Sequence, residues 1–219
     1  MKGFLFAVVL AGAIGSLQAQ PQSKTALLIV DMQNDFVRKG APMEVSDARN
    51  TINANQQLIN IFREKNLPVI YTKFLATPQP SLIYQWSPKL AAPVNACKKG
   101  FKRSYEDAKG ELECAEIIDE LKPGQSDIII EKYGYGAFHG TQLDSILKSL
   151  NITSLVVTGT VTQICVEETA REAFHYGYKT TVVSDAVSSF APDLHNAMLK
   201  NFAMKFGWVK TAREVAGAL

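Results

Sequence analysis

The sequence holds few of the residues that bind metals, and it carries little net charge. Its 219 residues include three histidines and three cysteines, and the formal net charge is +2. No two histidines stand at the spacing of metal ligands, so the sequence predicts no metal site. The small net charge gives no electrostatic reason to expect nucleic acid as a partner. The one cluster of basic residues, at 98–103, is typical of a solvated loop.

Long apolar runs are also missing, except at the N-terminus. There, Lys2 is followed by FLFAVVLAGAIG and then by SLQAQ, which is the pattern of a secretory signal. The run is short for a helix that spans a bilayer. We therefore expect a signal peptide at 1–19, a mature domain at 20–219, and export to a periplasm or the extracellular space. No stable membrane association is expected after cleavage. An uncleaved anchor or a buried first helix is the alternative.

Cysteine usage fits export. Cys97 and Cys114 lie in a polar, loop-like stretch, and in an oxidising compartment they could form a disulfide. That pairing would leave Cys165 as the odd, free thiol. The alternative is that Cys97 and Cys114 are both free.

Strands and helices are expected to alternate along the mature chain, whose composition is ordinary for one globular domain, with 47% hydrophobic residues. Expected strands are 26–31, 68–72, 128–132, 154–159, 179–184 and 208–210, and expected helices are 47–65, 113–121, 141–150, 165–176 and 192–206. This alternation predicts an α/β fold, a Rossmann-like three-layer sandwich with a six-stranded, mainly parallel sheet. Residues 74–110 are irregular, and we expect them to form a lid or an oligomer contact.

Three of the expected strands end at reactive side chains. LLIVD ends at Asp31, IIIEK ends at Lys132, and a Gly-Thr-rich turn after the fourth strand leads to Cys165. The carboxyl ends of parallel strands share one edge of the sheet, so these groups should converge. A helix N-terminus and a nearby lysine favour a thiolate, and a carboxylate can move its proton. Each residue alone has a plain structural explanation, but together they indicate nucleophilic catalysis by cysteine.

The loop at 134–140 could be taken for a nucleotide-binding loop. Its spacing is G-x-G-x-x-x-G, however, and no acidic residue ends the strand that follows it. Both departures argue against a dinucleotide site, so no cofactor is expected.

Three motifs resemble the isochorismatase-like cysteine hydrolase superfamily, which includes nicotinamidases, N-carbamoylsarcosine amidase, and ureidoacrylate and biuret amidohydrolases. They are DMQNDF at 31–36, EKYGYGAFHGT at 131–141 and GTVTQICVEETAREAFHYGY at 159–178. The resemblance implies a triad of Asp31, Lys132 and Cys165. It implies a cis peptide between Val161 and Thr162, and an oxyanion hole formed by the backbone N–H groups of Ile164 and Cys165. It also implies a homodimer or homotetramer.

The implied activity is hydrolysis of the C–N bond of a small amide, ureide or carbamoyl compound through a thioester acyl-enzyme. The histidine set with which nicotinamidases bind metal is absent before His139, and the namesake isochorismatases lack the cysteine. We expect Phe36, Tyr135, Phe138 and His139 to line the substrate pocket. A non-catalytic secreted binding protein, or a cysteine-dependent transferase or isomerase on the same fold, is the alternative.

Overall fold

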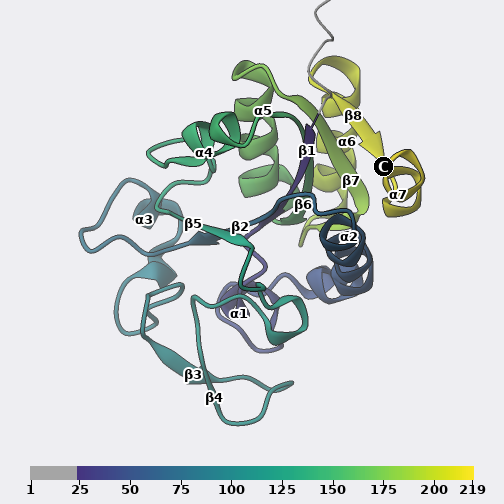
Figure 1. The fold of residues 1–219 in the computed structure, drawn as a ribbon. Coiled ribbons are helices and arrows are strands. Elements are labelled where there is room, and N and C mark those ends of the chain that lie inside the picture. The colour runs from purple at the N-terminus through teal and green to yellow at the C-terminus, as the bar shows by residue number, and fades with distance from the viewer. Residues whose placement is uncertain (1–23) are drawn as a thin grey trace, which may run out of the picture.

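A six-stranded parallel sheet runs through residues 24–219, the part of the chain that this computed structural model describes (Figure 1). The expected signal peptide at 1–19 lies outside the described residues. The sheet order is β5-β2-β1-β6-β7-β8, and every neighbouring pair is parallel. The strands are β1 (Lys24–Val30), β2 (Val69–Phe74), β5 (Ile128–Lys132), β6 (Ile152–Thr160), β7 (Lys179–Ser188) and β8 (Trp208–Lys210).

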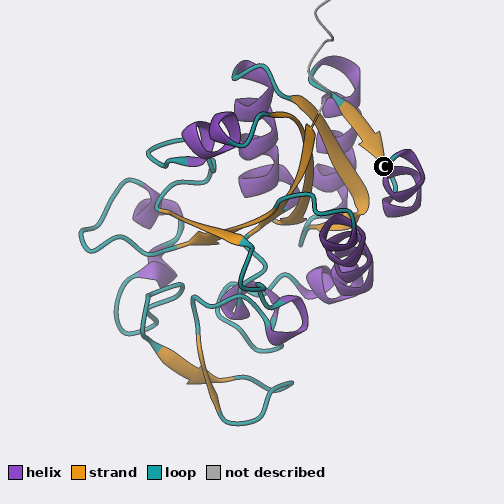
Figure 2. Ribbon diagram, in the orientation of Figure 1, coloured by secondary structure: helices purple, strands orange, loops and turns teal. Residues whose placement is uncertain are grey.

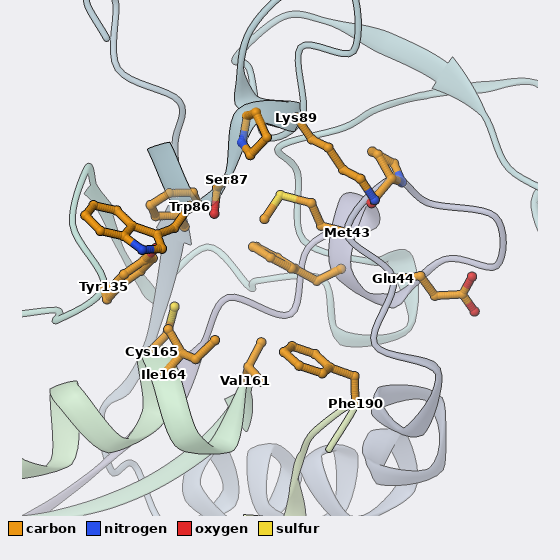
Figure 3. Close-up of a pocket in the computed structure, with 14 residues that line it drawn as sticks. Met43, Glu44, Trp86, Ser87, Lys89, Tyr135, Val161, Ile164, Cys165 and Phe190 are labelled. Atoms are coloured by element: carbon orange, nitrogen blue, oxygen red, sulfur yellow. The ribbon is translucent and has the colours of Figure 1, made fainter. Parts of the chain in front are cut away.

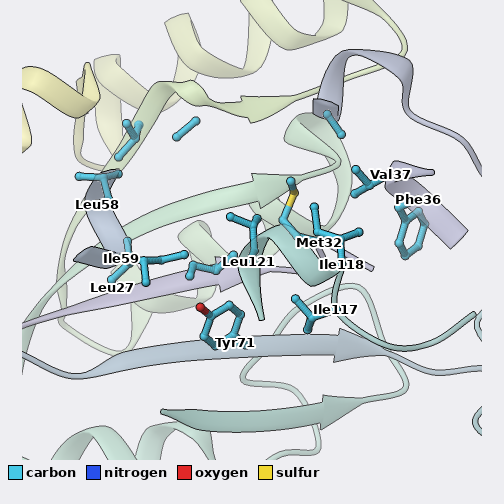
Figure 4. Packing of buried hydrophobic residues seen from close by; sticks show 14 of the residues in the cluster. Leu27, Met32, Phe36, Val37, Leu58, Ile59, Tyr71, Ile117, Ile118 and Leu121 are labelled. Carbon is cyan, nitrogen blue, oxygen red and sulfur yellow. The ribbon is translucent and has the colours of Figure 1, made fainter. Parts of the chain in front are cut away.

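Helices cover both faces of this sheet. One face carries α2 (Ile52–Glu64) and α7 (Ala212–Ala218), and the other carries α4 (Leu143–Ser149), α5 (Glu167–His175) and α6 (Pro192–Lys205) (Figure 1). Side chains of β1 alternate between the two cores. Leu27 (Figure 4) and Ile29 face the α2 side, whereas Leu28 and Val30 face the α5 side. A central strand buried on both faces explains the continuous apolar run. The three-layer α/β sandwich is confirmed. None of the helices within 24–219 is long and apolar enough to cross a membrane.

The segment between β2 and β5 departs most from expectation. It is mostly loop (Figure 2), with α3 (Ile83–Trp86) and an antiparallel hairpin of β3 (Lys102–Ser104) and β4 (Glu111–Glu113). The helix expected at 113–121 is wrong, and only a 3₁₀ turn forms at Asp119–Leu121. Its backbone instead bonds to the chain after β1: Asn34 N–H donates to the Glu116 carbonyl and Ile118 N–H to the Met32 carbonyl. The short α1 (Asn34–Val37) lies in that chain.

The disulfide that Cys97 and Cys114 could form is absent, and both residues are free, buried thiols. The Cys114 Sγ atom is directed at the Lys98 carbonyl oxygen, 3.2 Å away. The Cys97 N–H donates to the Asp35 carboxylate at 2.8 Å. The two cysteines are therefore packed around a buried polar cluster centred on Asp35.

Gly159, near the end of β6, allows β6 to approach β1 closely. Its φ is +108°, and a Cβ there would overlap the carbonyl oxygen of Val30. We expect Gly159→Ala to lower the free energy of unfolding by more than about 4 kcal/mol, or to prevent folding. Gly177→Ala is the matched control, because Gly177 has φ +88° and nothing within 4 Å of the added Cβ. The Gly177→Ala variant should lose only about 1–2 kcal/mol of its free energy of unfolding. Urea unfolding measures both, and equal losses would show that close packing is not what requires Gly159.

Candidate active site

The three reactive residues meet at the carboxyl edge of the sheet. Asp31 directly follows β1, Lys132 ends β5, and Cys165 lies in a π-helical turn, Thr162–Val166, that joins β6 to α5. The Lys132 Nζ atom is 2.7 Å from Asp31 Oδ2, and the Cys165 sulfur is within hydrogen-bonding reach of both groups. Asp31 and Lys132 are completely buried, and Cys165 is 4% exposed. The chain therefore brings the three predicted side chains into one contact.

Asp31 is held in an unusual backbone conformation. Its φ is +50°, in the left-handed region that L-residues rarely adopt and that persists only where the surroundings enforce it. The hydroxyl of Thr72, on β2, accepts from the Asp31 N–H at 3.1 Å and donates to Asp31 Oδ1 at 2.6 Å. Sequence reasoning missed Thr72. The available signal was a polar residue near the end of a buried strand beside the one that carries the acid.

Lys132 is a fixed cation. Its ammonium donates to the carbonyls of Gly134 and Tyr135, at 3.1 and 2.8 Å. Burial alone would lower the pKa of Lys132, but the charge of Asp31 and the contact with Cys165 outweigh it and raise the pKa above its usual value. The side chain is therefore protonated at neutral pH, and it stabilises negative charge on its two partners.

The surroundings of Cys165 favour a neutral thiol over the expected thiolate. Burial raises its pKa to about 12, because the lowering effect of Lys132 is opposed by burial and by the Asp31 carboxylate. Removing the thiol proton at neutral pH therefore requires an acceptor in contact with it, and Asp31 is in that position.

The turn that carries Cys165 differs from expectation at two points. Its cis peptide joins Thr160 to Val161 and not Val161 to Thr162, because β6 runs through Thr160 and the turn begins directly after Val161. The Ile164 N–H, expected in the oxyanion hole, is engaged with the Val161 carbonyl at 3.0 Å. The Val161 N–H is instead directed at the Cys165 sulfur. The role of the Cys165 N–H stays a prediction.

His195 on α6 supports the start of this turn. The Thr162 hydroxyl donates to the Ser188 carbonyl at 2.9 Å, so it is left to accept from His195 Nδ1, also at 2.9 Å. Burial lowers the pKa of His195, and the neutral ring therefore carries its proton on Nδ1. The sequence showed no sign of this role, because the two residues are 33 positions apart.

Removing the His195 ring should displace the turn without removing a reacting group. We expect His195→Ala to lower kcat by roughly 10- to 100-fold, with KM little changed. His195→Asn, whose amide can also donate, should recover part of the loss. His175→Ala, at an exposed histidine on α5, is the control and should leave kcat unchanged. A change in KM alone after His195→Ala would refute a positioning role.

The Cys165 sulfur opens onto a pocket of about 430 Å³ (Figure 3). Of the residues expected to contact substrate, Phe36 and Tyr135 line this pocket, and their contact with substrate stays a prediction. Phe138 does not line the pocket as expected. Its ring stacks on that of Tyr176, with the ring centroids 4.9 Å apart. His139 is exposed and also lies outside the pocket. The irregular segment does reach the site, through Trp86, Ser87, Pro88 and Lys89. Within 24–219, no three histidine, cysteine or acidic side chains group as metal ligands would.

Comparison with known proteins agrees with this geometry. The isochorismatase domain model matches residues 25–214. A ureidoacrylate amidohydrolase of Agrobacterium fabrum is 32% identical over 226 residues, with 93% of this chain and 96% of that protein covered. The crystal structure of N-carbamoylsarcosine amidase from Thermoplasma acidophilum has a TM-score of 0.71 at 30% identity, and covers 86% of this chain and 96% of its own. A cysteine hydrolase from Pseudomonas syringae pv. phaseolicola has a TM-score of 0.79 at 26% identity, covering 89% and 91%. The chain therefore belongs to the isochorismatase family, and it is an amidohydrolase of the kind that acts on non-peptide carbon–nitrogen bonds.

Proposed function

We propose that this protein hydrolyses the C–N bond of a small amide, ureide or carbamoyl compound through a thioester on Cys165. One observation carries the proposal: Cys165 lines the pocket, whereas Asp31 and Lys132, which contact its sulfur, are closed to solvent. A substrate carbonyl can therefore reach the nucleophile while the acid–base group stays dry, which strengthens every electrostatic interaction in the site.

In the first half-reaction, the sulfur attacks the carbonyl carbon as Asp31 takes the thiol proton. The backbone N–H groups of Val161 and Cys165 stabilise the resulting oxyanion, with Val161 replacing the expected Ile164. The tetrahedral intermediate collapses, its C–N bond breaks, and Asp31 gives its proton to the departing nitrogen. The products are the thioester and ammonia or an amine.

In the second half-reaction, Asp31 takes a proton from water as the water oxygen attacks the thioester carbonyl. Collapse breaks the C–S bond, the carboxylic or carbamic acid leaves, and the proton on Asp31 returns to the sulfur. Lys132 stays protonated throughout, and its charge stabilises the negative charge that develops on the sulfur during attack.

Turnover is tested by ammonia release from a panel of small amides, ureides and carbamoyl compounds, using the purified protein. Release from at least one compound is the expected result, and it begins to name the substrate. No release from any compound would contradict the proposal and would favour a binding protein or a transferase on the same fold.

Export and self-association belong to the same proposal. The apolar run after Lys2 supports a signal removed after Ala19, so the mature protein should begin at Gln20. Intact mass of protein recovered from the periplasm or medium tests this, and a cytoplasmic protein that retains residues 1–19 would contradict it.

Light scattering should find a homodimer or homotetramer, and a monomer would contradict that part.

A further inference from the structure

The walls nearest the nucleophile are apolar and aromatic. The Phe74 ring lies between those of Phe36 and Tyr135, with ring centroids 6.3 and 6.2 Å apart. Val161 and Ile164 line the side that belongs to the nucleophile turn (Figure 3). A substituent on the reacting carbonyl would therefore be in contact mainly with the carbon atoms of these five side chains.

The charged side chains of the pocket are already engaged, and they lie away from the sulfur. The Glu44 carboxylate accepts from Arg49 at 2.7 Å and from the Gly40 N–H at 2.9 Å. The Lys89 ammonium donates to the Pro42 carbonyl. Both charged ends lie on the side of the pocket away from Cys165 (Figure 3). A substrate carboxylate placed between the aromatic walls would lose its hydration without gaining a free cation, because Lys132, the cation near the Phe74 ring, is already paired with Asp31. Such a placement is unfavourable.

Two large apolar side chains stand at the mouth of the pocket with most of their surface in solvent. Trp86 of α3 is 74% exposed, and Phe190, which follows β7, is 59% exposed. Burying such rings against an apolar ligand is favourable in proportion to the area removed from water. The helix α3 that carries Trp86 has no buried residue. The folded chain therefore covers little of this ring, and a bound ligand could cover more of it.

From these observations we infer that the substrate carries an uncharged, apolar group beside the reacting carbonyl, and that Trp86 selects for it. This inference rests on the proposed function, since it concerns the same pocket. It also sets the chain apart from the relatives named for ureidoacrylate, an acid.

Binding is tested without turnover. The chain has two tryptophans, so Cys165→Ala combined with Trp208→Phe leaves Trp86 as the single fluorescent indole in an inactive protein. Benzamide and hexanamide should change its emission and bind at least roughly tenfold more tightly than their anionic counterparts, 4-carbamoylbenzoate and adipamate. The matched control, Cys165→Ala with Trp86→Phe, should give no signal. Equal or tighter binding of the anionic amides would overturn the inference.

Selectivity is tested by turnover. In Trp86→Ala, the ratio of kcat/KM for hexanamide to that for acetamide should fall roughly tenfold. Trp208→Ala, at a 52% exposed tryptophan on β8, should keep the wild-type ratio. An unchanged ratio in Trp86→Ala would overturn the role of Trp86. If no amide is hydrolysed, the proposed function fails, yet the fluorescence titration still decides the ligand class.

Discussion

Replacing Cys165 by alanine is expected to abolish ammonia release, with kcat/KM lowered by at least about 10⁴-fold. The reason is that the thioester cannot form without the sulfur, so the pocket can still bind the substrate but no longer supplies a nucleophile. The alanine should still fit, because it leaves space on the side that already opens to the pocket. Ammonia release from the best substrate, measured on both proteins, checks this.

Cys114→Ala is the matched control for this variant. Cys114 is also a buried free thiol, but its sulfur contacts the Lys98 carbonyl and does not line the pocket. It should retain turnover within a few-fold of the wild type. Residual activity of Cys165→Ala above a tenth of the wild-type value would mean that another group is the nucleophile.

Replacing Asp31 by asparagine should separate thiol reactivity from turnover. Turnover is expected to fall by roughly 10³- to 10⁴-fold, since no group remains to carry the proton. Cys165 should nevertheless become more reactive toward iodoacetamide. The carboxylate raises the pKa of the thiol and Lys132 lowers it, so removing the carboxylate lets the pKa fall from about 12. Below both pKa values, each unit of this fall raises the thiolate fraction tenfold.

The measurement is the pH dependence of Cys165 labelling, followed by peptide mass so that Cys97 and Cys114 are counted separately. Lys132→Met should have the opposite effect, because it removes the group that lowers the pKa of the Cys165 thiol. Cys165 should be labelled more slowly in this variant than in the wild type. Slower labelling of Asp31→Asn would contradict the account. It would mean that Asp31 already holds the thiol proton in the resting enzyme.

The sheet and the triad were predictable because their signals are local. Asp31 and Lys132 each end a short apolar run, and a parallel sheet brings the ends of such runs to one edge whatever lies between them. The helix expected at 113–121 failed because its backbone bonds to Met32 and Asn34, which no pattern within the segment records.

The supporting contacts escaped prediction for the same reason. Thr72 is 41 positions from Asp31, and His195 is 33 positions from Thr162. Phe138 was expected in the pocket because it lies in the lysine motif, yet its ring turns to Tyr176 beyond α5. A motif places a residue along the chain, but the direction of its side chain depends on elements that the motif does not contain.

The central claim, a shared thioester on Cys165, is tested most directly by partition between water and hydroxylamine. Two substrates with the same acyl group and different leaving groups, such as a primary amide and its N-methyl amide, are hydrolysed with hydroxylamine present. A common acyl-enzyme predicts one ratio of hydroxamate to acid for both, because both pass through the same thioester. A ratio that depends on the leaving group would contradict the account, since the acceptor would then be attacking the substrate itself.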